Sequence, residues 1–97
     1  MKYKLIIDIS VWSSFENIAK YYLDKNPNYI TKVYESLLNH FKYIANNPFM
    51  YQELDYNPRY RFATILKKYI LVYTIKENVV EILLFADAKT DYPNMLK

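Results

Sequence analysis

The fold of this chain is decided by the stretch Lys67-Lys68-Tyr69-Ile70-Leu71-Val72-Tyr73-Thr74-Ile75, then Lys76-Glu77-Asn78, then Val79-Val80-Glu81-Ile82-Leu83-Leu84-Phe85. Two apolar runs of strand length, rich in β-branched and aromatic residues, flank a short polar segment, and this pattern predicts a β-hairpin. The chain contains no glycine. Its turns must therefore use other residues that tolerate positive φ, and Asn78 is the one we expect in this hairpin.

The segments before the hairpin predict two strands and two helices. Residues 2–8 alternate between apolar and polar side chains, as in a strand, whereas from about Ser10 the apolar residues recur at helical spacing. Pro27 ends this first helix, because the residue before a proline avoids the helical conformation. The remaining predictions are a strongly amphipathic helix from 28 or 29 to 45, a loop over 49–58 and a strand over 59–66 with both arginines on one side.

This order, β-α-α-β-β-β, predicts an α+β fold. We expect a helical hairpin packed on one face of a small, mainly antiparallel four-stranded sheet. The other face is then left for a partner. We find no repeat or linker in the 97 residues, so a single domain over 1–97 is expected.

Composition excludes several classes of function. Without glycine, no P-loop or dinucleotide-binding fingerprint can be formed. Without cysteine, and with His40 as the sole histidine, neither a disulfide nor a zinc site is expected. No metal or other cofactor is predicted. We find no signal peptide and no apolar run of the roughly 20 residues that a membrane helix needs, so we expect a cytoplasmic protein without a membrane partner.

Positive charge is concentrated in one part of the sequence. The net charge is only +3, but the stretch 57–76 contains no acidic residue. Its five basic residues, which include the only two arginines of the protein, are Arg59, Arg61, Lys67, Lys68 and Lys76. Two arginines on one strand face are candidates for binding phosphate or an acidic partner, although a solvated strand face is an equally good interpretation.

The whole pattern resembles a known family of small proteins. Its helical part has the spacing Phe15, Ile18, Tyr21, Tyr22 before Asn26-Pro27, and Asn47-Pro48 follows the second helix. An arginine-bearing strand at 59–65, the runs 69–75 and 79–85, and a tail with Asp91-Tyr92 and Leu96 complete it. In this order the segments resemble the RelE/ParE superfamily of bacterial type II toxin–antitoxin toxins. One departure is the absence of a glycine after Pro48.

The resemblance implies a toxin that is held inactive by a cognate antitoxin, in a module of the plasmid-stabilisation kind. RelE-like members cut messenger RNA on the ribosome, whereas ParE-like members poison DNA gyrase by binding. Antitoxin and toxin would form a hetero-oligomer, and antitoxin is able to complete a sheet edge by adding a strand.

Metal-free RNA cleavage needs a general base, a general acid and positive charge around the phosphate. If the chain is a nuclease, the candidates for these catalytic roles are Arg61, Arg59, Lys68 and, as proton donor, Tyr92. A basic residue near this tyrosine is usual in RelE-like members, but here the segment after the last strand is Ala86-Asp87-Ala88-Lys89. Glu53 and Asp55 are the nearby carboxylates for a base.

We therefore expect a ParE-like toxin that acts by binding and has no enzymatic activity. The residues expected to bind partners are Arg59, Arg61, Lys67, Lys89 and Tyr73, although Tyr73 also suits sheet packing. The alternative is a ribosome-dependent endoribonuclease of the RelE kind. A further alternative is an inactive remnant that retains antitoxin binding.

Overall fold

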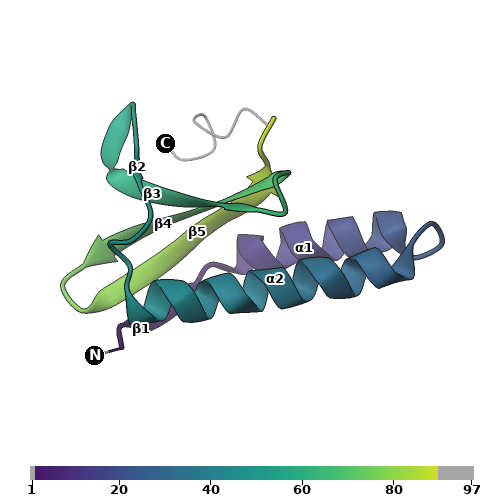
Figure 1. Cartoon of the computed structure of the whole chain (residues 1–97), viewed down its shortest axis with the longest axis horizontal. Coiled ribbons are helices and arrows are strands. Elements are labelled where there is room, and N and C mark those ends of the chain that lie inside the picture. Colours follow the sequence, from purple (N-terminus) through teal and green to yellow (C-terminus); the bar gives the residue numbers. More distant parts are fainter. Residues whose placement is uncertain (1, 90–97) are drawn as a thin grey trace.

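The structure is a computed structural model that describes residues 2–89, and it contains two helices and a five-stranded sheet (Figure 1). The elements are β1 (Lys4–Ile7), α1 (Ile9–Tyr22), α2 (Pro27–Asn46), β2 (Glu53–Leu54), β3 (Asn57–Ile65), β4 (Tyr69–Lys76) and β5 (Val79–Asp87). The α+β class and the order of the predicted elements are confirmed.

The predicted number of strands was wrong by one. The segment expected to be a loop over 49–58 contains β2, which pairs antiparallel with β3. The pairing is extended by the Phe62 amide, which donates to the Gln52 carbonyl at 3.1 Å. A strand of two residues is too short to show the alternation on which sequence patterns depend.

The strand order in the sheet is β1-β5-β4-β3-β2. The predicted hairpin forms its centre: Tyr69 of β4 lies opposite Asp87 of β5, and Lys76 lies opposite Val79. Only the pairing of β1 with β5 is parallel. A bulge interrupts the hairpin where Val72 pairs with Leu84 and Tyr73 with Ile82, leaving Leu83 without a partner in the ladder.

Both helices begin at side-chain caps. The Asp8 carboxylate accepts a hydrogen bond from the Ser10 amide at 3.0 Å, and bonds to Ser10 hold the pKa of Asp8 below its usual value. Asn26 caps α2 by accepting from the Tyr29 amide at 3.3 Å, with Pro27 in the first turn, where a missing N–H costs nothing. Neither these helices nor any other within residues 2–89 is long and apolar enough to cross a membrane.

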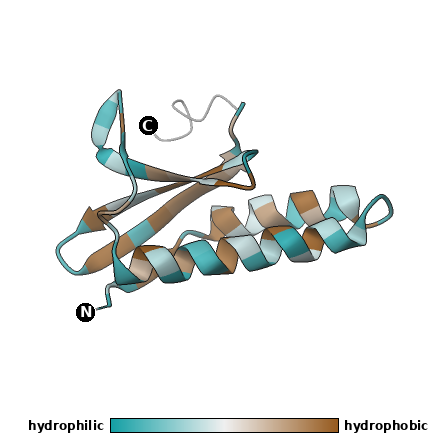
Figure 2. Cartoon of the chain, in the orientation of Figure 1, coloured by the Kyte–Doolittle hydropathy of each residue, from teal (hydrophilic) through white to brown (hydrophobic). Residues whose placement is uncertain are grey.

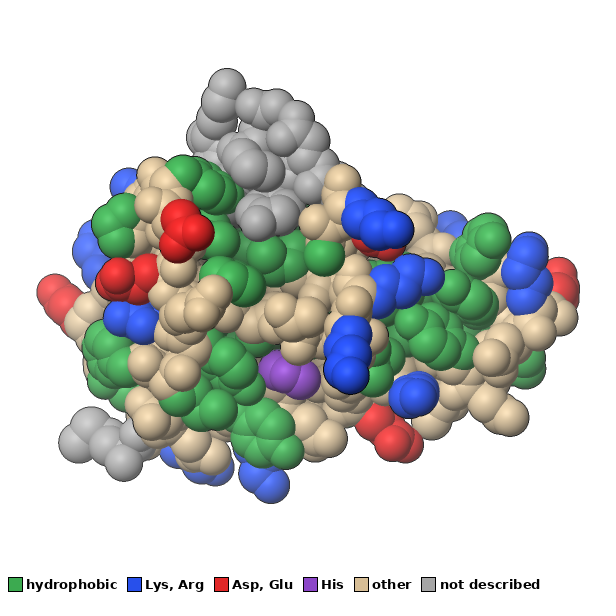
Figure 3. Space-filling model, turned by 45° about the horizontal axis from the view of Figure 1, so that its top comes forward, with side chains coloured by type: hydrophobic (Ala, Val, Ile, Leu, Met, Phe, Trp, Pro, Cys, Tyr) green, Lys and Arg blue, Asp and Glu red, His purple; other side chains and the backbone are tan. Residues whose placement is uncertain are grey.

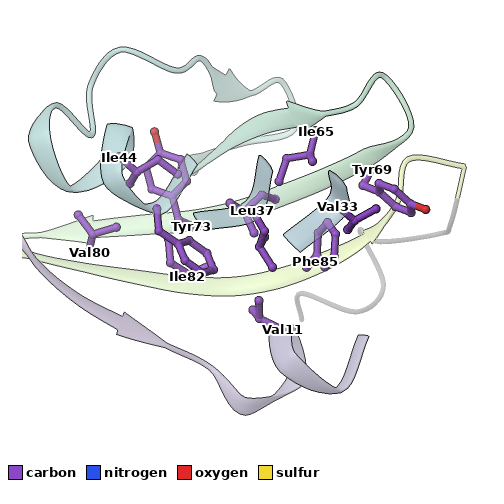
Figure 4. Packing of buried hydrophobic residues seen from close by; sticks show 12 residues of the cluster. Val11, Val33, Leu37, Ile44, Ile65, Tyr69, Tyr73, Val80, Ile82 and Phe85 are labelled. Atoms are coloured by element: carbon purple, nitrogen blue, oxygen red, sulfur yellow. The ribbon is translucent and has the colours of Figure 1, made fainter. Parts of the chain in front are cut away.

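The main core lies between the helices and one face of the sheet. Figure 1 shows α1 and α2 side by side on this face, and Figure 2 shows hydrophobic residues along the strands and parts of both helices. Val33, Leu37 and Ile44 of α2 point toward Tyr73 and other side chains of the sheet (Figure 4). All of these side chains are fully buried, so the predicted apolar face of α2 does pack on the sheet.

The opposite face of the sheet carries a second apolar cluster. It is built from five buried residues, namely Leu54, Tyr60, Ile70, Val72 and Leu84. On β4 they occupy the positions that alternate with those of the main core, as the period of two in a strand requires. On β5 the bulge at Leu83 shifts the alternation, so Ile82 packs in the main core and Leu84 in the second cluster. The face predicted for a partner is therefore partly apolar, and these five side chains are buried.

Between residues 2 and 89, three residues have positive φ: Leu66 (54°), Lys67 (57°) and Glu77 (57°). The expectation that Asn78 has the positive φ was wrong. Pairing of Lys76 with Val79 leaves a two-residue loop, and its first position, Glu77, is the one that turns left-handed. Between β3 and β4 both Leu66 and Lys67 are left-handed, and the Lys68 amide donates to the Ile65 carbonyl at 3.1 Å.

Candidate interaction surfaces

Arg61 holds the loop that joins α2 to β2. Its Nη1 donates to the Tyr51 carbonyl at 2.7 Å and to the Phe49 carbonyl at 3.4 Å, and its Nη2 lies 3.4 Å from Glu53 Oε2. The guanidinium also lies over the Phe49 ring, 5.2 Å from its centroid. We call Arg61 with these three partners the Arg61 clamp. Its guanidinium donors are mostly directed to the protein's own chain.

Tyr73 lies beneath the same loop and is fully buried. Its hydroxyl donates to the Pro48 carbonyl at 2.6 Å, and burial raises the pKa of the phenol well above its usual value. Tyr73 also lies opposite Arg61 in the ladder between β3 and β4. The structure shows the packing role of Tyr73, and the binding role predicted for it stays a prediction.

Arg59 has a different environment from Arg61, although both belong to β3. It is exposed, its Nη2 donates to the Tyr60 hydroxyl at 2.9 Å, and its guanidinium lies 5.1 Å from the centroid of the Tyr60 ring. Arg59 lines a shallow hollow of about 320 Å³ with residues that include Thr74 and Glu81. The two guanidinium groups therefore contact different protein partners, and their joint binding of a phosphate stays a prediction.

Lys68 stands at the edge of an open cleft of about 480 Å³. We call it the tyrosine cleft, and its lining residues are Ser14, Asn17, Ile18, Tyr21 and Tyr22 of α1, Lys68 and Tyr69, and Phe85, Ala86 and Asp87 of β5. Figure 3 shows basic side chains (blue) around a hydrophobic patch (green) toward the end of the molecule where α1 ends and α2 begins.

The lysine is fixed in this cleft by aromatic residues. Lys68 Nζ donates to the Tyr22 hydroxyl at 3.0 Å and lies 5.6 Å from the ring centroids of both Tyr22 and Tyr69. The bond to Tyr22 raises the pKa of Lys68, so the ammonium stays charged. Tyr29 donates to the Tyr69 hydroxyl at 3.2 Å, and burial is the main cause that raises the pKa of Tyr69.

The other predicted site residues are scattered. Lys67 is exposed in the β3–β4 turn, and Lys89 is exposed after β5, where its amide donates to Asp87 Oδ1 at 2.9 Å. Tyr92 lies outside the described residues. Of the carboxylates considered as a base, Glu53 belongs to the Arg61 clamp and Asp55 is exposed. Whether any of these residues catalyses or binds stays a prediction.

His40 is half-buried, with its Nδ1 2.7 Å from the Ser36 carbonyl one turn earlier. Its ring lies near those of Tyr43 and Tyr51. These contacts place His40 at the boundary between the core and the surface. Among residues 2–89, no three side chains of histidine, cysteine, aspartate or glutamate come together in a way that could hold a metal ion.

Sequence reasoning missed the tyrosine cleft. Tyr22, Tyr29 and Tyr69 come from α1, α2 and β4, and they meet only after the helical hairpin has packed on the sheet. The sequence does contain a signal, because twelve of its residues are tyrosine. This abundance does not reveal which tyrosines converge.

The architecture defines a class of small α+β proteins in which a helical hairpin covers one face of a mainly antiparallel sheet. A solved structure described as a chromosomal ParDE TA system from P. aeruginosa has this fold, with a TM-score of 0.75 and 13% sequence identity. The similarity covers 91% of the present chain and 98% of that chain.

The family follows from the sequence itself. The family model of the ParE toxin of the type II toxin–antitoxin system parDE matches residues 6–92. The chain therefore belongs to the ParE toxin family. A search of curated proteins found no match.

Proposed function

We propose that this protein is the toxin of a type II toxin–antitoxin module, that it stops growth by binding a target such as DNA gyrase, and that a cognate antitoxin neutralises it. Membership of the ParE family and the likeness to a ParDE structure support an antitoxin partner. Gyrase is the target that the family resemblance suggests. With this target the toxin acts in the cytoplasm. In its inactive form it is bound to the antitoxin in a hetero-oligomer.

The observation that favours binding over RNA cleavage is that the Arg61 guanidinium is bonded to the protein's own loop. A nuclease needs its arginine directed at a scissile phosphate, in a site prepared before the substrate arrives. Here the guanidinium is directed at the carbonyl of Tyr51 and the carboxylate of Glu53. Turning it toward RNA would leave the Tyr51 carbonyl without this donor.

Expression in a bacterial host tests the proposal. Induction of the chain alone is expected to arrest growth, and co-expression of the small gene next to it is expected to restore growth. The purified protein is then expected to inhibit supercoiling by gyrase and to lose this effect when the neighbour's product is added. Harmless induction without binding of the neighbour's product would overturn the toxin assignment.

The same cells separate the two alternatives. Primer extension on translated messages detects cuts in the ribosomal A site, and cuts that disappear in Arg61→Ala would support the RelE-like endoribonuclease instead. Antitoxin binding without growth arrest would identify an inactive remnant.

A further inference from the structure

We propose that the tyrosine cleft is a docking site for a partner polypeptide that presents an apolar side chain next to a carboxylate. The apolar side chain would lie against Ile18 and the exposed ring of Tyr21, and the carboxylate would bind at Lys68 and the phenol of Tyr22. This site is separate from the Arg61 clamp, and the proposal does not depend on the identity of the toxin's target.

The size and lining of the cleft fit a side chain. A volume of about 480 Å³ lies within the range of sites that bind small organic groups. Ile18 and the ring of Tyr21 provide accessible apolar surface, and Lys68 and Tyr22 stand beside it. An apolar surface with a few polar groups at one side selects a ligand with an apolar part and one polar end.

The Lys68 end of the cleft has hydrogen-bond donors that a ligand can use. The Lys68 ammonium has three N–H donors, and within residues 2–89 its acceptor is the Tyr22 hydroxyl. That hydroxyl accepts the bond from Lys68 and keeps its own proton as a donor. The charged ammonium and these donors therefore favour a ligand with anionic oxygen atoms, and a carboxylate supplies them.

The arrangement of the rings argues against a nucleic acid base as the ligand. Bases bind by stacking on an open aromatic face. In this region Lys25 lies over the Tyr21 ring at 4.4 Å, and Lys68 lies over the rings of Tyr22 and Tyr69. Tyr21 and Tyr22 also pack edge to face, with their ring planes at 84°. Cations and neighbouring rings thus occupy surfaces that a base would need.

Among the described residues that line the cleft, Asp87 is the one acidic residue, and it limits where a carboxylate can bind. Its Oδ1 accepts from the Lys89 amide, so the carboxylate is partly engaged in its own turn. A second carboxylate is repelled from Asp87 and attracted to Lys68, Lys67 and Lys25. The expected orientation places the ligand's carboxylate beside Tyr22.

Two peptides that differ by one group test the proposal on the full chain. The probes are acetyl-Phe-Glu-amide and its neutral counterpart acetyl-Phe-Gln-amide, titrated at low salt while amide chemical shifts are followed by NMR. We expect shifts at Ile18, Lys68, Phe85 and Ala86, with the Glu peptide binding roughly fivefold more tightly, as a single partly exposed charge pair provides.

The variant Lys68→Met is expected to abolish the preference for Glu over Gln while weak binding of the phenylalanine remains. Lys67→Met is the matched control, because it removes an adjacent exposed lysine and should keep most of the preference. Urea denaturation shows whether both variants are folded. Equal affinity for the two peptides, an unchanged preference in Lys68→Met, or no shift at the cleft at millimolar peptide would each overturn the proposal. Stronger shifts of the same amides with the oligonucleotide dT4 would overturn it in favour of a nucleic acid.

Discussion

The Arg61 clamp and the tyrosine cleft place two basic residues of the same acid-free stretch in opposite situations. Arg61 donates to carbonyl oxygens of its own chain and pairs with Glu53, whereas Lys68 has one phenol as acceptor and stands at the edge of an open cleft. The sequence gives both residues the same charge. Their availability to a partner depends on how many of their donors the fold already uses.

The largest expected effect is at Tyr73, which lies beneath the loop that the Arg61 clamp holds. Tyr73→Ala removes a fully buried ring and the hydrogen bond to Pro48, so we expect the free energy of unfolding to fall by about 4 kcal/mol. Urea denaturation followed by circular dichroism measures the change. A loss below about 1 kcal/mol would mean that this region is as open as the tyrosine cleft.

Arg61→Met should have the next largest effect. The methionine keeps much of the apolar stem but leaves the Tyr51 carbonyl without its charged donor, so a loss of about 2 kcal/mol in unfolding free energy is expected. The matched control is Arg59→Met, whose exposed guanidinium bonds to one phenol and should contribute less than about 1 kcal/mol. Equal losses in the two variants would contradict the existence of a clamp.

The buried phenol of Tyr73 should also make stability fall in alkali. Its pKa is raised in the folded protein, so above the ordinary pKa near 10 the unfolded chain releases a proton that the folded chain keeps. The contribution of the neutral Tyr73 phenol to the unfolding free energy is fully present below pH 10. It decreases above this pH, and the loss is about 1.4 kcal/mol at pH 11. Unfolding free energies at pH 9 and 11 should show this decrease in the wild type and lack it in Tyr73→Phe, with the other tyrosines contributing alike to both.

The smallest effect is expected in the tyrosine cleft. Tyr22→Phe removes the acceptor of an exposed lysine and keeps the ring, so the unfolding free energy should change by less than about 0.5 kcal/mol. The same denaturation experiment applies, with Tyr73→Phe as the buried counterpart. If Tyr22→Phe proved the more destabilising of the two, the cleft would be a structural element of the fold.

The sequence was sufficient for the elements that repeat a pattern over many residues. The apolar spacing of α2 and the two apolar runs of the hairpin predicted their structures to within a few residues, because long-range packing reinforces the local pattern there. The sequence pattern was insufficient for turns, where one or two residues determine the backbone conformation. Leu66 and Lys67 adopt positive φ although neither residue is typical of such a turn, and only the pairing of β3 with β4 imposes it.

The candidate site was less predictable than the fold. Arg59, Arg61, Lys67 and Lys68 stand out in the sequence as a basic group, but their partners do not. Tyr22 reaches Lys68 from another element, and the Tyr51 carbonyl that binds Arg61 is a backbone atom, which leaves no trace in residue type. Charge can be read from a sequence, whereas its neutralisation by distant groups requires the structure.

The parallel pairing of β1 with β5 has a consequence for the synthesis of the protein. Lys4 lies beside Val79 and Ile7 beside Ile82, so of the described strands the first to be synthesised pairs with the last. A nascent chain that has reached β4 has both helices but lacks Val80, Ile82 and Phe85, which the helices need to complete their core. Such late closure is typical of slow, non-local folding. The core beneath the two helices can therefore close only after β5 has been synthesised.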